Sequence, residues 1–176
     1  LAERGFRVEG LDLSPFLIER MREYNGGRYD IPVYCADIHQ PPEELCGRYD
    51  AVVGFFVLHH LADLHKAFAA IGRLLRPGGR AVFLEPNPYN PLYYAQLLIT
   101  PGMSWSAEQG IWNMRPGVVF SAMQATGMTR IGMTRYGFFP PFLSNRAWGM
   151  RLERALEQIS LWRPFLPFQL FRGERP

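Results

Sequence analysis

Short apolar runs alternate with helical patterns over the first half of the chain. Four apolar runs have the length and composition of β-strands: 7–13, 32–36, 49–57 and 80–85. Between them, apolar residues recur every three or four positions, which predicts helices at about 15–25 and 61–75. Strands that alternate with helices are typical of a parallel sheet covered by helices. The pattern therefore predicts an α/β fold with a doubly wound, Rossmann-like, mostly parallel sheet and helices on both faces.

Start and stop signals mark the ends of the expected helices. Ser14 followed by Pro15 suits a helix N-terminus, because serine accepts a bond from the first turn and proline fits the first helical position. The run Asn25-Gly26-Gly27 ends that helix. The run Arg76-Pro77-Gly78-Gly79 ends the next helix and turns the chain into the strand that starts at Arg80. The continuous apolar run 49–57 suits a central strand that is buried on both faces.

The pattern changes after Glu85. Proline and asparagine dominate residues 86–91, which predicts a loop, and an apolar uncharged helix is expected at 92–99. The remaining expected elements are a helix at 117–126, a strand at 128–136, a helix at 147–161 and a strand-like stretch at 164–171. We find no internal repeat, and 176 residues suit a single domain over 1–176.

Composition narrows the class of protein. Hydrophobic residues make up 48% and charged residues 20% of the chain, as in ordinary globular proteins, and no run reaches the roughly 20 apolar residues that span a bilayer. Cys35 and Cys46 form neither a disulfide framework nor a metal-binding pattern, so we expect a cytoplasmic protein. Residues 1–5 read as a helix end with Gly5 as its cap. We therefore expect an earlier strand, the first of the sheet, to be missing from this sequence.

Charge and aromatic residues are unevenly distributed. Residues 86–176 hold nine Arg against four Glu and 15 of the 25 aromatic residues, whereas residues 1–85 are slightly acidic. This predicts either a helical cap with a solvated arginine rim or a surface for an acidic substrate, an amphipathic substrate or a membrane face. Lys66 is the only lysine and the arginines are dispersed, so we expect no nucleic-acid partner.

Two aspartates stand where predicted strands end. Asp12, followed by Leu13, closes the first strand, and Asp37, followed by Ile38, closes the second. Ligands of open parallel sheets bind outside the carboxyl ends of strands, and a carboxylate accepts bonds from a ribose diol or an exocyclic amine. We therefore predict a nucleoside across these strand ends, with Ile38 against its ring. The ordinary alternatives are a charge at a helix N-terminus for Asp12 and a solvent-facing turn for Asp37.

The end of the run 49–57 carries further candidates. Gly54 allows a ligand to approach the backbone, and Phe55 suits a pocket wall. Either His59 or His60 suits a general base, since histidine titrates near neutrality, although capping or packing is the ordinary alternative. Adjacent histidines rarely bind one ion and no complementary Cys or His follows, so we expect no metal site. Glu85 is expected to cap a loop rather than to contact substrate.

The order of these motifs resembles that of class I S-adenosylmethionine-dependent methyltransferases. The resemblance covers about residues 1–85 and rests on five segments: Gly10-Leu11-Asp12-Leu13-Ser14, Ala36-Asp37-Ile38, Tyr49-Asp50-Ala51-Val52-Val53, Leu58-His59-His60-Leu61 and Leu75-Arg76-Pro77-Gly78-Gly79-Arg80. The glycine-rich loop that follows the first strand of this family has no counterpart in the sequence. We therefore expect the chain as given to bind cofactor poorly and to be inactive by itself.

The resemblance implies a fold, a cofactor and residue roles. It implies that residues 1–85 bind S-adenosylmethionine, with Asp12 on the ribose hydroxyls, Asp37 on the adenine amine, and Gly54 and Phe55 near the methionine part. Residues 86–176 are then a substrate cap followed by C-terminal strands that end in an antiparallel hairpin. The implied reaction is an in-line methyl transfer, for which the protein mainly aligns the reactants.

The acceptor is expected to be a small aromatic or amphipathic molecule. Aromatic residues within 86–115 and near 138 suit a roof over it: Tyr89, Tyr93, Tyr94, Trp105, Trp112, Phe138 and Phe139. Arg115, Arg135 and Arg146 are available to bind an anionic group of the acceptor. One alternative is a non-catalytic or membrane-peripheral module, favoured by the uncharged stretch 86–107. A nicotinamide-dependent oxidoreductase fits less well, because no tyrosine stands four residues before Lys66. The oligomeric state stays open.

Overall fold

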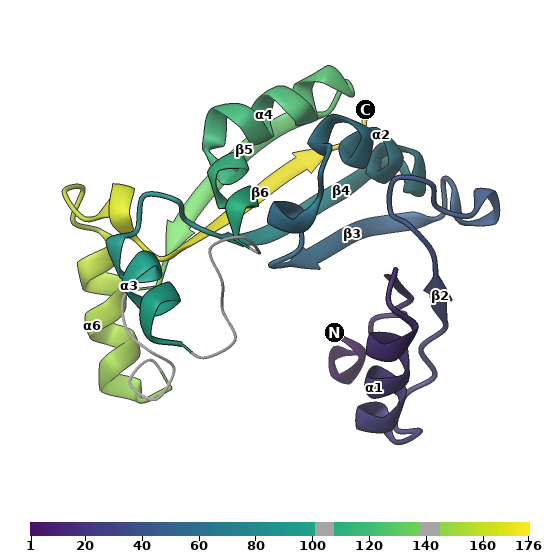
Figure 1. The fold of residues 1–176 in the computed structure, drawn as a ribbon, viewed down its shortest axis with the longest axis horizontal. Helices are drawn as coiled ribbons and strands as arrows, with labels where there is room; N and C mark the ends of the chain where they lie inside the picture. The colour runs from purple at the N-terminus through teal and green to yellow at the C-terminus, as the bar shows by residue number, and fades with distance from the viewer. Residues whose placement is uncertain (101–107, 138–144) are drawn as a thin grey trace.

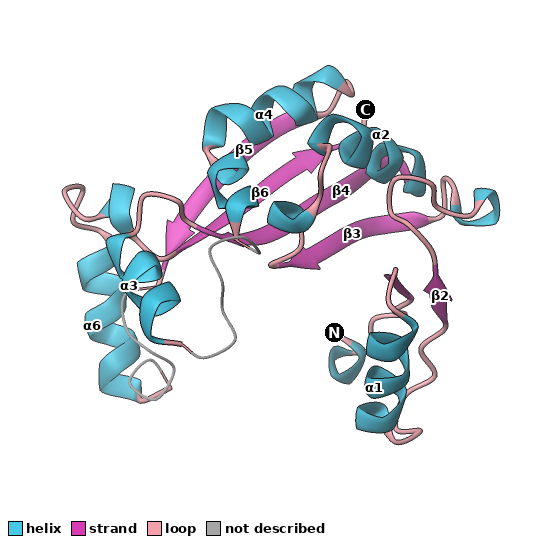
Figure 2. Cartoon of the chain, viewed as in Figure 1, coloured by secondary structure: helices cyan, strands magenta, loops and turns pink. Residues whose placement is uncertain are grey.

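The computed structural model describes residues 1–100, 108–137 and 145–176, and their strands form two sheets (Figures 1 and 2). In the smaller sheet, β1 (Gly10–Asp12) pairs in parallel with β2 (Val33–Cys35). The larger sheet has the order β3-β4-β6-β5 and contains β3 (Tyr49–Phe55), β4 (Leu75–Pro86), β5 (Thr129–Tyr136) and β6 (Phe168–Glu174). β3 and β4 are parallel, and β6 is antiparallel to both of its neighbours. This arrangement confirms the predicted α/β, Rossmann-like fold with antiparallel C-terminal strands.

Helix α1 begins at its predicted signal, Ser14-Pro15, whereas α2 begins at Leu64 rather than at the expected residue 61, because Asp63 caps it. The α-helices are α1 (Pro15–Asn25), α2 (Leu64–Leu74), α3 (Pro91–Ile99), α4 (Pro116–Ala125) and α6 (Ala147–Glu157). Short 3-10 helices are η1 (Ala2–Arg4), η2 (Glu43–Leu45), η3 (Leu58–His60), η4 (Gln109–Met114) and η5 (Arg163–Phe165). Proline opens α1, α3 and α4, where its missing N–H costs nothing. Within the described ranges, no helix combines the length and apolar character needed to cross a bilayer.

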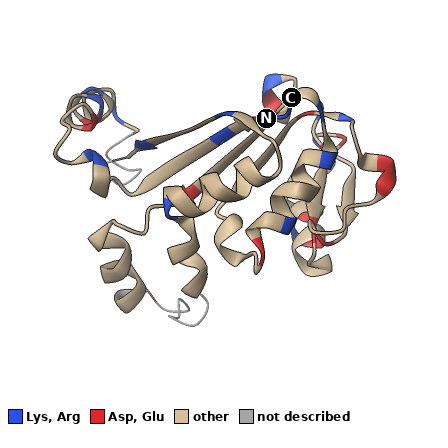
Figure 3. Ribbon diagram, turned by 90° about the horizontal axis from the view of Figure 1, so that it is seen from above, with Lys and Arg blue, Asp and Glu red and all other residues tan. Residues whose placement is uncertain are grey.

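The main core lies between one face of the larger sheet and the pair α2 and α4, which run side by side over it (Figures 1 and 3). Phe68 of α2 meets Phe83 of β4 edge-on, with ring centroids 5.8 Å apart, and both are buried. Phe171 of β6 and Val119 of α4 are fully buried in the same cluster. This packing fixes the ends of β3 and β4, from which η3 and the loop after β4 emerge.

The other face of β3 is less covered than expected. Val53 and Phe55 are 42% and 64% exposed, while Gly54 between them faces the core. Successive residues of a strand point to opposite faces, so β3 is buried on one face only in the described part of the chain. The prediction of a strand buried on both faces is therefore wrong for these residues.

The expected turn before β4 lies inside it. Tyr49 pairs with Leu75, and the next pair of the ladder joins Ala51 to Arg80, so residues 76–79 bulge out of the strand. Gly78 has φ +74°, which glycine adopts without steric cost. The strand thus starts at Leu75 rather than at Arg80.

Two C-terminal elements differ from their predicted bounds. The last strand is β6 (Phe168–Glu174) rather than 164–171, because Pro164 and Pro167 cannot donate to a strand ladder and the chain forms η5 instead. Helix α6 ends at Glu157, four residues before the expected end at 161. Helix ends are weakly encoded by apolar periodicity, since it reports on the packed face and not on the cap.

Replacing Gly72 by alanine is expected to stabilise the protein. Gly72 lies inside α2, and apart from its chain neighbours and the backbone of that helix, a Cβ at this position would meet no heavy atom within 4 Å. Glycine inside a helix costs about 0.5–1 kcal/mol relative to alanine. Urea unfolding should therefore show a rise of about 0.5–1 kcal/mol in the free energy of unfolding. A fall in the free energy of unfolding would show that α2 packs more tightly at Gly72 than described.

Candidate functional site

The two predicted aspartates lie at the ends of neighbouring strands. Asp12 ends β1 and pairs with Cys35, the last residue of β2, two positions before Asp37. The Ala36 amide donates to the Asp12 carbonyl oxygen at 3.1 Å, which continues the pairing beyond the strands. Because the strands are parallel, both carboxylates come from the same edge of this sheet. Their role in binding a nucleoside stays a prediction.

Asp12 also organises the start of α1. Its Oδ1 accepts a 2.8 Å bond from the Ser14 amide, and the Ser14 hydroxyl accepts a 3.3 Å bond from the Leu17 amide. These bonds place the Asp12 carboxylate at the N-terminus of α1, which is the ordinary structural role considered for it. Leu13, between the two, is 69% exposed. The strand end therefore presents an apolar side chain next to a carboxylate.

Asp37 belongs to a loop that is tied to the larger sheet. Its Oδ1 accepts a 2.9 Å bond from the His39 amide and lies 2.8 Å from His39 Nδ1. The His39 amide chiefly holds the pKa of the Asp37 carboxyl below its usual range, so this group is ionised at neutral pH. His39 Nε2 lies 3.3 Å from the carbonyl oxygen of Asp63, and Ile38 packs against the main core. These contacts fix the Asp37 loop beside the segment that joins η3 to α2.

Gly54 and Phe55 point to opposite faces of β3. A Cβ on Gly54 would lie 2.6 Å from the Phe83 ring and 2.7 Å from Val57, so core packing alone accounts for this glycine. The exposed ring of Phe55 lies on the other face. Whether either residue contacts cofactor stays a prediction.

Phe56, directly after β3, has an unusual backbone conformation. Its φ of +54° is rare for a residue with a side chain, and such strain concentrates at functional sites. The Phe56 amide donates to the Leu84 carbonyl oxygen at 2.8 Å, and its ring lies 5.7 Å from the Phe168 ring. The ring of this strained residue thus lies beside the first residue of β6.

A buried carboxylate organises η3. Glu85, near the end of β4, is fully buried, and its Oε1 accepts bonds from the amides of Val57 at 2.9 Å and Leu58 at 2.8 Å. Its Oε2 lies 2.7 Å from Nδ1 of His59. The capping role expected for Glu85 is confirmed by the two amide bonds. The contact with His59 adds a second role, because it fixes the orientation of that imidazole.

Glu108 and Tyr93 complete this cluster. Glu108 Oε2 lies 3.7 Å from His59 Nε2, and the Tyr93 hydroxyl donates to the same oxygen. A Cβ on Gly110 would lie 1.7 Å from the His59 carbonyl oxygen, so η4 approaches η3 as closely as only glycine allows. Sequence reasoning considered Tyr93 only as part of an aromatic roof and missed Glu108. A signal existed, because Glu108 is the only charged residue between Pro86 and Met114.

Two buried asparagines hold α3 over this region. Asn90 caps α3 by accepting bonds from the amides of Leu92 at 2.7 Å and Tyr93 at 3.1 Å. Its side-chain amide donates to the Phe165 carbonyl oxygen at 2.7 Å. Asn87 donates to the carbonyl oxygens of Pro164 and Leu166, each at 2.8 Å. The loop after β4, α3 and η5 are therefore locked together, which sets the position of Tyr93.

A cavity of about 480 Å³ opens beside the cluster, and we call it the η3 cavity. Its lining includes Phe56, His60, Tyr93, Gln96, Glu108 and Phe168. The His60 ring lies 3.9 Å from the His59 ring and is more exposed than its buried neighbour. Burial, followed by the charge of His59, lowers the pKa of His60 below its ordinary value. At neutral pH His60 is therefore an uncharged imidazole that can accept a proton.

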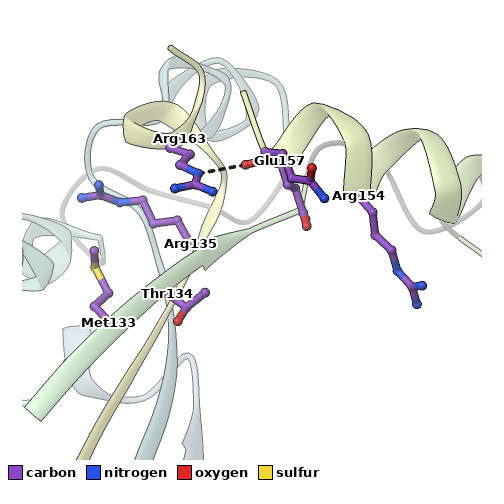
Figure 4. A pocket seen from close by; sticks show the side chains of 7 residues that line it. Met133, Thr134, Arg135, Arg154, Glu157 and Arg163 are labelled. Atoms are coloured by element: carbon purple, nitrogen blue, oxygen red, sulfur yellow. Dashed lines mark hydrogen bonds between the residues drawn. The ribbon is translucent and has the colours of Figure 1, made fainter. Parts of the chain in front are cut away.

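A second cavity, of about 560 Å³, lies between β5 and α6 and is mainly basic (Figure 4). Arg135, Arg154 and Arg163 line it with Glu157, whose carbonyl oxygen accepts a 3.1 Å bond from Arg163 Nε. Of the three arginines predicted to hold an anionic group, only Arg135 lines this cavity, so the structure does not bring them together there. Trp105, Phe138 and Phe139 of the predicted roof lie outside the described residues.

Charged residues are unevenly distributed over the elements that follow β4. Neither α3 nor α4 contains a charged residue, and arginines mark β5 and the C-terminal elements (Figure 3). In the parts of the chain that are described, no three His, Cys, Asp or Glu side chains are arranged to hold a metal ion.

Comparisons with known proteins identify similar sequences and folds. A family model described as a methyltransferase domain matches residues 1–83. An uncharacterized 37.1 kDa protein in transposon TN4556 of Streptomyces fradiae is 40% identical over 81 residues, or 46% of this chain and 23% of that protein. The ubiquinone biosynthesis O-methyltransferase of Pseudomonas aeruginosa is 33% identical over 97 residues, or 53% of this chain and 40% of that protein.

Solved structures share the fold of the whole chain. Phosphoethanolamine N-methyltransferase 2 of Haemonchus contortus, in complex with S-adenosyl-L-methionine, has a TM-score of 0.64 at 16% identity. The match covers 99% of this chain and 44% of that one. This chain thus spans less than half the length of each of these three proteins.

Proposed function

We propose, from the premise that this chain belongs to the class I S-adenosylmethionine-dependent methyltransferase family, that the protein methylates a small-molecule acceptor. The observation that carries this proposal is the shared edge of β1 and β2, which presents Asp12 and Asp37 from neighbouring strand ends. In open sheets of this kind, ligands bind outside the carboxyl ends of the strands.

The residues of the smaller sheet suit the nucleoside part of the cofactor. We assign Asp12 to the ribose hydroxyls and the ionised Asp37 to the adenine amine, with Leu13 and Ile38 as apolar neighbours. Phe55 and the backbone at Gly54 are assigned to the methionine part. When bound, S-adenosylmethionine supplies an electrophilic methyl group on a sulfonium. The carboxylates orient this group, which is the main contribution a protein makes to an in-line transfer.

The η3 cavity suits the acceptor. His60 faces the cavity as a neutral imidazole and accepts the proton that the acceptor loses. His59 lies deeper, between Glu85 and Glu108, and positions His60 through ring contact. The similar proteins include an O-methyltransferase, an N-methyltransferase and a C-methyltransferase by name, so their names do not select the acceptor atom.

Replacing either aspartate by alanine is expected to weaken cofactor binding. A hydrogen bond to a charged group contributes about 1.5–3 kcal/mol, which corresponds to about 10-fold to 150-fold in affinity. Calorimetric titration of the full-length protein with S-adenosylhomocysteine should show this loss for both Asp12→Ala and Asp37→Ala.

The matched control is Asp50→Ala. Asp50 lies at the opposite end of a strand, where its exposed carboxylate pairs with Arg76 at 2.5 Å. Its replacement should leave the affinity for S-adenosylhomocysteine unchanged. Unchanged affinity in both test variants removes Asp12 and Asp37 from the site, and no binding by the unaltered protein contradicts the proposed function.

A further inference from the structure

The polar cluster at the η3 cavity carries a net negative charge. His59 lies between two carboxylates, with Nδ1 at 2.7 Å from Glu85 and Nε2 at 3.7 Å from Glu108. The side chain of Glu85 is fully buried and that of Glu108 is 15% exposed, so water screens their charges weakly. With ionised carboxylates the cluster carries two negative charges when His59 is neutral and one when it is protonated. Both protonation states therefore attract a cation.

No protein cation balances this charge among the described residues. The lining of the η3 cavity there includes no lysine or arginine. Besides Glu108 and the two histidines, its polar side chains are the uncharged ones of Asn90, Tyr93 and Gln96. The sequence segments 101–107 and 138–144 contain no charged residue at all. The charged groups that act on His60 are His59, Glu108 and Glu85. The charge of the residues that line this cavity is therefore opposite in sign to that of the arginine-lined cavity beside α6.

Aromatic rings form a wall of the same cavity. Phe56 and Phe168 lie 5.7 Å apart with their planes tilted by 57°, so they form a corner. Tyr93, whose hydroxyl binds Glu108, adds a third ring close to the carboxylate. Ring faces attract cations, and a desolvated cation gains about 2 kcal/mol from such a contact. Leu92, Pro86 and Pro167 supply apolar surface for the rest of a ligand.

We propose that the η3 cavity binds a positively charged acceptor, a small amine with a short apolar body. This proposal rests on the proposed function and names the acceptor class for it. The charged nitrogen lies beside Glu108 and against the rings of Phe56 and Phe168. An anionic acceptor of the same shape is excluded, because the cavity offers it a second negative charge and no cation.

The transfer to such an amine is balanced without another reactant. The ammonium loses one proton to a ring nitrogen of His60, and the nitrogen lone pair forms a bond to the methyl carbon. The electrons of the broken carbon–sulfur bond stay on sulfur, which leaves the neutral thioether of S-adenosylhomocysteine. The methylated nitrogen carries the positive charge afterwards, and Glu108 stabilises it in the product as in the substrate.

Three probes of one shape test the charge preference. Choline is a cation with a trimethylammonium end, whereas 3,3-dimethylbutan-1-ol is neutral and 3,3-dimethylbutanoate is an anion, and both carry a tert-butyl end of the same shape. Each is titrated into the full-length protein saturated with S-adenosylhomocysteine, so that the position of the cofactor is already filled. We expect choline to bind about tenfold more tightly than the alcohol, and the butanoate to bind more weakly than both.

Variants test whether the preference for choline arises from residues that line the η3 cavity. Glu108→Gln keeps the shape of the side chain and should lower the affinity for choline about tenfold while leaving that for the alcohol within about twofold. Phe56→Leu removes a ring and should lower only the affinity for choline, which tests the wall independently of Glu108. Glu43→Gln is the matched control, since Glu43 is an exposed glutamate in η2, and it should change neither affinity.

The outcomes separate this proposal from the proposed function. Equal affinity for choline and the alcohol in the unaltered protein, or choline binding that Glu108→Gln and Phe56→Leu both leave unchanged, overturns the cationic acceptor. Such a result leaves methyl transfer intact, because binding of S-adenosylhomocysteine is measured beforehand in its own titration. Failure of that titration overturns the proposed function, and with it the acceptor that this proposal names.

Discussion

Replacing Glu85 by alanine is expected to lower the free energy of unfolding by about 3–5 kcal/mol. The fully buried carboxylate accepts bonds from the amides of Val57 and Leu58 and holds His59 at 2.7 Å. Its removal leaves two amides and an imidazole without their partner in a site that water does not reach, and buried donors without acceptors are costly. Urea unfolding followed by circular dichroism measures the loss.

Two further substitutions serve as a comparison and a control for Glu85→Ala. Glu85→Gln keeps an acceptor oxygen for the amides and removes the charge, so we expect about half of the loss seen with alanine. Glu43→Ala removes an exposed glutamate from η2 and should change the free energy of unfolding by less than about 0.5 kcal/mol. If the free energy of unfolding of Glu85→Ala lies within about 1 kcal/mol of that of the unaltered protein, the loss is no larger than at surface positions. Glu85 then does not organise η3.

Replacing His60 by alanine is expected to lower the rate of methyl transfer by about 10²–10⁴-fold, the usual contribution of a general base. Both histidines line the η3 cavity, but the two ring nitrogens of His59 each face a carboxylate, which leaves His60 as the candidate base. The rate is measured as formation of S-adenosylhomocysteine from S-adenosylmethionine and a panel of small primary amines. Affinity for S-adenosylhomocysteine should stay unchanged, because the loss concerns proton transfer and not cofactor binding.

The pH dependence of the rate gives a second readout for His60. Burial and His59 lower the pKa of His60, so the base stays unprotonated down to a lower pH than an ordinary histidine, whose pKa is about 6.5. The rate should fall as the pH drops through this lowered pKa, because the protonated ring no longer accepts a proton. This acidic limb should disappear in His60→Ala and persist in His65→Ala, which removes an exposed histidine of α2. A full rate in His60→Ala rejects His60 as the base.

Local patterns in the sequence were sufficient for much of the fold. The helical spacing of apolar residues identified α2, and Ser14-Pro15 and Asn25 placed the ends of α1. These features depend on neighbours within about one helical turn, so they are readable along the chain. The bulge at residues 76–79 and the start of β6 were misplaced, because strand bounds depend on pairing with distant segments.

Some residues of the candidate site could likewise be identified from the sequence, and others only from the structure. Asp12 and Asp37 were readable because each follows its own apolar run. The contact of Glu108 with His59 and Tyr93 was not readable, since it needs η4 to pack on η3 at Gly110 and α3 to be held by Asn90. Glu85 was read as a cap, and its hold on His59 emerged only when β4 was placed beside β3.

The sequence by itself determined the fold class, the family resemblance and the two carboxylates at strand ends, because periodicity and strand-end chemistry are local properties of the chain. The tertiary structure decided which groups surround His59 and His60, and therefore the charge and shape of the η3 cavity. Those depend on contacts between segments far apart in the sequence, such as Glu108 with His59 and Phe168 with Phe56. The free energy of such contacts comes from burial, which exists only once the chain has folded.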